Sequence, residues 1–93
     1  MKVRFIIKDL DHINDKYITV EDSFVSILPN VGEFVNLSKL HVLLADTKDI
    51  KIDYIVNVLG KEPRLDVFLS NNWEGFNNSN IPHVLDITEA DLR

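Results

Sequence analysis

Apolar and polar residues alternate along several short stretches of the chain, with the period of two that is typical of half-buried β-strands. The first example is KVRFIIK at residues 2–8, in which one face is wholly apolar. The stretch KYITV at residues 16–20 is rich in β-branched and aromatic side chains, which favour strands. Residues 9–15 between them are rich in turn formers. We therefore expect a hairpin with a long loop.

The second half of the chain carries a clearer hairpin pattern. IKIDYIVNVL at residues 50–59 alternates over its whole length, and RLDVFLS at residues 64–70 follows after the turn sequence GKEP. Two alternating runs joined by a short Gly/Pro turn predict a hairpin. The side chains predicted to face the core are Ile50, Ile52, Tyr54, Val56 and Val58 of the first strand and Leu65, Val67 and Leu69 of the second.

Weaker patterns predict the remaining elements. SFVSIL at residues 23–28 and VGEFVNL at residues 31–37 are expected to be strands, with Gly32 forming a bulge or a tight bend. IPHVLDI at residues 81–87 is expected to be a final edge strand, because its proline cannot donate to a central ladder. TEADLR at residues 88–93 predicts one terminal helical turn.

Residues 38–46 leave two alternatives open. Ser38 could cap a short helix, whereas the apolar run LHVLL could equally form a strand. Taken together, the patterns predict a single domain spanning residues 1–93 that is mainly β. Its expected fold is a small barrel or a strongly twisted antiparallel sheet with one or two short helical segments.

The stretches LPNVGEFVNL (residues 28–37) and YIVNVLGKEPRLDVFL (residues 54–69) resemble a pattern in small single-domain proteins of bacteria and phages. Those proteins carry a Pro-x-Val-Gly-Glu entry into one strand and are similar to SH3-like barrels in layout. The resemblance covers about a third of the chain, which departs from the pattern by a longer insertion at residues 38–49 and its own C-terminal extension. It implies an SH3-like barrel and carries over no activity and no functional residues.

Composition narrows the classes of function. The 93 residues include no cysteine, which excludes a disulfide framework and cysteine catalysis and favours a reducing compartment. The net charge of −5 repels phosphate backbones, so we expect no nucleic-acid partner. No apolar run approaches the ~18 residues that span a bilayer, and the N-terminal stretch lacks a signal-peptide pattern. We therefore expect a cytoplasmic protein with no membrane partner.

No motif in the sequence specifies a reaction. Asp9 and Asp11 begin like a calcium loop, but the later positions that an EF-hand needs are missing. The histidines His12, His41 and His83 lie in separate segments, without the spacing of a local metal site. There is no phosphate loop, dinucleotide fingerprint or nucleophile elbow. We therefore expect neither an enzyme nor a cofactor or metal site.

Several apolar side chains are predicted to point away from the core. Such side chains form an exposed apolar patch, which is typical of a protein–protein contact, unless another part of the same chain covers them. The loop LSNNWEGFNNSN at residues 69–80 carries two aromatic side chains that fit either interpretation, and packing against the sheet is favoured for its tryptophan. The side chains predicted to point away from the core are those of Ile6, Phe34, Ile55 and Phe68. The candidate interaction residues are Phe34, Ile55, Phe68, Trp73 and Phe76.

Two hypotheses about function follow from these observations. The first is a non-enzymatic interaction or assembly module that binds another protein or a second copy of itself as a homodimer. The alternative is a small-ligand or metal-binding domain without an assignable reaction, which would use the three histidines and the loop at residues 9–15.

Overall fold

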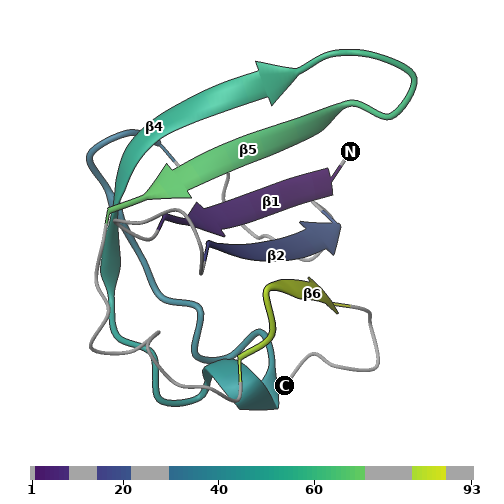
Figure 1. Ribbon diagram of the computed structural model, residues 1–93. Helices are drawn as coiled ribbons and strands as arrows, with labels where there is room; N and C mark the ends of the chain where they lie inside the picture. Colours follow the sequence, from purple (N-terminus) through teal and green to yellow (C-terminus); the bar gives the residue numbers. More distant parts are fainter. Residues whose placement is uncertain (1, 9–14, 22–29, 71–80, 88–93) are drawn as a thin grey trace.

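The computed structural model describes residues 2–8, 15–21, 30–70 and 81–87, and they form one curled sheet of six strands (Figure 1). The strand order across the sheet is β3-β4-β5-β1-β2-β6. The elements are β1 (Lys2–Ile7), β2 (Lys16–Glu21), β3 (Phe34–Val35), the 3₁₀ turn η2 (Val42–Leu44), β4 (Ile50–Val58), β5 (Arg64–Leu69) and β6 (Val84–Ile87).

The strand pairing confirms the mainly β prediction and both hairpins. β1 pairs with β2 and β4 pairs with β5, each in antiparallel orientation. The sheet is mixed, however, because β1 also pairs with β5, and β2 with β6, in parallel. The expected small barrel or strongly twisted antiparallel sheet is thus a mainly β, curled sheet that also contains two parallel pairings. Alternation within a strand indicates which side chains share a face, but it does not indicate whether the neighbouring strand runs parallel or antiparallel.

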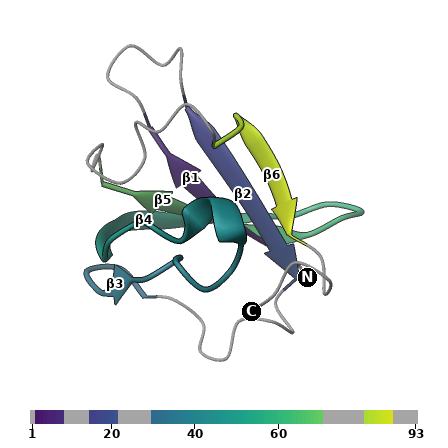
Figure 2. The ribbon, with the colours of Figure 1, turned by 90° about the horizontal axis from the view of Figure 1, so that it is seen from below.

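The hydrophobic core lies on the inner side of the curl. Figure 2 shows η2 and β3 on this inner side, where the segment between β3 and β4 lies over the sheet. Leu37 and Leu44 from that segment are buried together with side chains from the strands. The core cluster consists of Val3, Phe5, Ile7, Ile18, Val20, Leu37, Leu44, Ile50, Ile52, Leu65, Val67, Leu69, Ile81, Leu85 and Ile87.

The segment at residues 38–46 forms no strand, and its short helical part is a 3₁₀ turn that begins later than Ser38. Asn36 Oδ1 accepts a hydrogen bond from the Ser38 amide at 3.0 Å, so the backbone turns at the residue expected to begin a helix. Helical geometry starts later, where His41 Nδ1 accepts from the Leu43 amide at 3.0 Å. The result is the three-residue turn η2, which buries Leu44 alone.

The strand predicted at residues 31–37 is shorter than expected, because only Phe34–Val35 is extended and paired. Gly32 has a φ of +88°, a conformation that glycine adopts without strain, so it forms the tight bend rather than a bulge. Its amide donates to the Ile52 carbonyl at 3.0 Å, and the Ile52 amide donates to the Glu33 carbonyl at 2.9 Å. These bonds attach the bend to the side of β4.

A bulge in β4 reverses the faces predicted for its second half. Ile52 lies opposite Leu69, and Tyr54 lies opposite Phe68, so Asp53 is an additional residue in the ladder. The prediction that Tyr54, Val56 and Val58 face the core was therefore wrong. Tyr54 and Val56 are 50% and 42% exposed.

The C-terminal strand is an edge strand, as predicted, and it begins after Pro82 and His83. The Tyr17 amide donates to the His83 carbonyl at 2.7 Å. Next to it, the buried Lys16 donates from Nζ to the Ile81 carbonyl at 2.6 Å. The strand predicted at residues 23–28, most of the loop at residues 9–15 and the terminal turn at residues 88–93 lie outside the described residues.

Candidate functional site

The outer face of the sheet, opposite the core cluster, carries a line of apolar side chains across five strands. Ile6 of β1 lies opposite Tyr17 of β2 and Phe68 of β5. Tyr17 in turn lies opposite Val84 of β6, and Phe68 lies opposite Tyr54 of β4. We call these five residues (Val84, Tyr17, Ile6, Phe68 and Tyr54) the apolar row.

The two ends of the apolar row are exposed to solvent and its centre is buried. Tyr54 is 50% and Val84 60% exposed, whereas Ile6 is 2% exposed although it lies outside the core cluster. The rings of Tyr54 and Phe68 stack with their centroids 4.3 Å apart and their planes 14° apart. A stacked pair holds both rings in one orientation, so this end of the row is an ordered aromatic surface.

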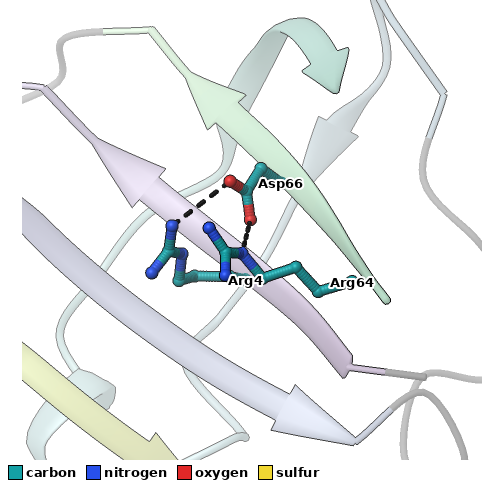
Figure 3. Close-up of polar contacts among 3 residues, drawn as sticks. All are labelled: Arg4, Arg64 and Asp66. Atoms are coloured by element: carbon teal, nitrogen blue, oxygen red, sulfur yellow. Dashed lines mark hydrogen bonds and ion pairs between the residues drawn. The ribbon is translucent and has the colours of Figure 1, made fainter. Parts of the chain in front are cut away.

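Charged side chains border the apolar row. The Asp66 carboxylate accepts from Arg4 Nη2 at 3.2 Å and from Arg64 Nε at 2.8 Å, and it joins β5 to β1 (Figure 3). The Arg4 guanidinium also lies 5.1 Å from the centre of the Tyr17 ring. Lys8 Nζ lies 5.6 Å from the centre of the Phe68 ring. Both cations lie over the faces of aromatic rings in the row, an arrangement in which the cation and the ring attract each other.

The position of Arg4 leaves one of its donors without a partner. Within the described part of the chain, Arg4 Nε is buried and makes no hydrogen bond. The Arg4 side chain as a whole is 27% exposed, so it is only partly removed from water. The guanidinium is thus held by Asp66 and by the Tyr17 ring rather than by a complete set of hydrogen bonds.

A hollow of about 430 Å³ lies on the outer face beside these arginines. Its charged lining consists of Lys2, Arg4 and Arg64 together with Glu21, Glu62 and Asp86. Three positive and three negative side chains balance, so the hollow favours neither anionic nor cationic ligands.

The structure places three of the five candidate interaction residues. Phe34 is 65% exposed on β3, and Phe68 is half-buried in the apolar row, so both point away from the core as predicted. Ile55 packs against the core cluster, because the bulge turns it inward, and its predicted outward orientation was wrong. Trp73 and Phe76 lie outside the described residues.

Sequence reasoning missed most of the apolar row. Tyr17 alternates with the buried Ile18, a signal that was present in the pattern. Tyr54 and Val56 were assigned to the wrong face because nothing in their own stretch marks the bulge. Val84 enters the row only through the parallel pairing of β6 with β2, which the sequence pattern does not report.

The histidines that the structure describes have structural contacts. His41 caps η2, and His83 Nδ1 lies 3.2 Å from the Asp15 carbonyl oxygen. Over the described ranges, no three His, Asp or Glu side chains are grouped so that they could hold a metal ion. His12 and the pair Asp9 and Asp11 lie outside these ranges.

No family model, curated protein or solved structure matches the chain. The resemblance to SH3-like barrels of bacteria and phages therefore stays a prediction. Among the residues that the structure describes, no helix has the length and apolar character needed to cross a bilayer.

Proposed function

We propose that the chain is a non-enzymatic interaction module of the cytoplasm that binds a protein partner through the apolar row. The observation that carries this proposal is the stacked pair Tyr54 and Phe68, whose tyrosine is 50% exposed on the outer face of the sheet. Large aromatic side chains that are held rigid and exposed are favoured anchors of protein interfaces. The absence of cysteine supports a reducing compartment.

The surroundings of the stacked pair support the same proposal. Val56 is 42% exposed on the same face and extends the apolar surface along β4. Arg4, Asp66 and Lys8 provide charge at its border. An apolar centre with a charged rim is the usual arrangement of an interface between proteins that also exist apart.

Immobilised protein, used to capture partners from a lysate of the source organism, tests the proposal. The variant Tyr54→Thr/Val56→Thr keeps strand-forming side chains while it removes the exposed aromatic and aliphatic groups. We expect it to lose capture of the wild-type partner by at least ~10-fold, since central aromatic anchors contribute about 2 kcal/mol or more.

The matched control is Val42→Thr, because Val42 is 64% exposed in η2, away from the outer face. It is expected to capture the partner as the wild type does. Equal recovery by all three folded proteins would show that the apolar row is not the binding surface.

A further inference from the structure

In the part of the chain that the structure describes, the second half of β4 is paired on one side only. β3 pairs only with Lys51 and Ile50, and its preceding bend uses the backbone groups of Ile52. From Tyr54 to Val58, no strand among the described residues pairs with the side of β4 that faces away from β5. Figure 1 shows this part of β4 at the margin of the sheet. We call residues 54–58 the open edge.

The open edge lacks the features that normally prevent strands from pairing with one another. Sheet edges are usually protected by charged side chains, prolines or bulges. Lys51, Asp53 and the bulge lie at the β3 end of β4. The five residues Tyr54, Ile55, Val56, Asn57 and Val58 carry no charge, in a chain of which 27% is charged. An extended strand is therefore the shape of partner that fits this edge.

The open edge is complementary to itself. When two strands pair antiparallel about a twofold axis perpendicular to the sheet, opposite residues lie on the same face. A register centred on Val56 places Tyr54 opposite Val58 of the second copy and Val56 opposite its own counterpart. Every outer-face pair is then apolar, and the Tyr–Val pairs are of the aromatic with β-branched kind that stabilises sheets.

Neighbouring registers fit less well. A register centred on Ile55 brings Val58 against Ile52 of the second copy, whose backbone groups already bond to the bend before β3. A register centred on Asn57 places Tyr54 opposite Gly60, which lies beyond the end of the strand. The register centred on Val56 uses the whole open edge and stops where β3 begins.

We propose that two copies of this chain pair antiparallel through the open edge, in the register centred on Val56, and form one continuous sheet. The inference rests on the proposed function, because it names a second copy as the partner of the surface to which Tyr54 and Val56 belong. The shared apolar row then runs from one copy into the other across the twofold axis. Since each copy carries a net charge of −5, the fraction of dimer rises with salt.

The absence of cysteine makes a direct test of this register feasible. Val56→Cys places two thiols opposite each other at the twofold axis, within the Cα separation that a disulfide needs. Val84→Cys is the matched control, because Val84 is more exposed but lies on the opposite edge strand. Under mild oxidation, we expect Val56→Cys to form a covalent dimer ~10-fold faster, because pairing raises the effective concentration of its thiols.

Sedimentation velocity provides the second measurement, on protein without cysteine. We expect the wild type to form a dimer and Val56→Lys, which places like charges at the twofold axis, to be a folded monomer. Cross-linking of Val56→Cys no faster than that of Val84→Cys would overturn the inference, and so would a monomeric wild type. If the wild type is a monomer that still captures a foreign protein, the dimer is overturned and the proposed function stands. If the protein is a cross-linked dimer that captures no foreign protein, the dimer is supported and the foreign partner of the proposed function is ruled out.

Discussion

Asp66 is the most buried charged residue among those that the structure describes, a carboxylate that is only 5% exposed in the middle of a sheet. Its two oxygens accept hydrogen bonds from Arg4 and Arg64, so its buried charge is paired on both sides. The two arginine side chains are 27% and 35% exposed, and solvent weakens both ion pairs. The main effect of the two hydrogen bonds is therefore to offset the cost of burying the Asp66 carboxylate, and their net contribution to the free energy of unfolding is small.

Asp66→Asn tests this account at the scale of one residue. The amide keeps the shape of the carboxylate, but it carries no charge and its nitrogen cannot accept a hydrogen bond from a guanidinium group. We therefore expect a loss of about 1–2 kcal/mol in the free energy of unfolding. Urea titration followed by circular dichroism measures the change. Asp86→Asn is the control, since Asp86 is exposed on the same face and is expected to change stability by less than ~0.5 kcal/mol. Equal losses for both variants would contradict the account.

At the scale of the element, the bulge at Asp53 decides which residues of β4 meet the core. Before it, Ile50 and Ile52 are buried, and after it Ile55 packs inward while Val56 faces solvent. Burial in the core therefore stabilises the fold through Ile55 and much less through its neighbour Val56. Both halves of the strand therefore contact the core, the first through Ile50 and Ile52 and the second through Ile55.

Ile55→Thr and Val56→Thr form a matched pair that tests the reversal. Both variants keep a β-branched side chain, so strand propensity changes little. We expect Ile55→Thr to destabilise the fold by about 1–2 kcal/mol, because it places a hydroxyl against the core, and Val56→Thr to cost less than ~0.5 kcal/mol. Urea midpoints of the two variants measure the difference. If Val56→Thr were the more damaging change, the strand would alternate without a bulge.

The sequence was sufficient for the elements that depend on local pattern and insufficient for those that depend on pairing. Both hairpins could be predicted because alternation and turn residues lie next to each other in the chain. The outward direction of Phe68 followed from the same alternation. The faces of Tyr54 and Ile55 could not be predicted, because an extra residue in a ladder is defined by the strand opposite. The place of Val84 in the apolar row depends on a parallel pairing with residues far away in sequence.

At the scale of the whole molecule, stability is expected to vary across the sheet. β1 lies at its centre and pairs along its whole length with β2 on one side and β5 on the other. β6 pairs over four residues on one side, and β3 over two. The centre therefore opens only with the entire fold, whereas the margins can separate on their own.

Amide hydrogen exchange measures this gradient. We expect amides of β1 to exchange most slowly, at rates that follow the global free energy of unfolding, and those of β3 and β6 to exchange much faster. Destabilising the fold by Asp66→Asn is expected to speed exchange in β1, which provides an internal check. Protection of β6 equal to that of β1 would mean that this margin does not open independently.

The bulge also makes the outer surface tolerant of one particular deletion. Deleting the codon for Asp53 removes the additional residue and leaves strict alternation along β4, so Ile52 and Ile55 would still face the core and Tyr54 and Val56 would still face outward. The pairing of Tyr54 with Phe68 is kept, since every other residue keeps its partner on β5. An evolving lineage can thus lose Asp53 in one mutational step while the aromatic end of the apolar row and the hairpin that carries it stay in place.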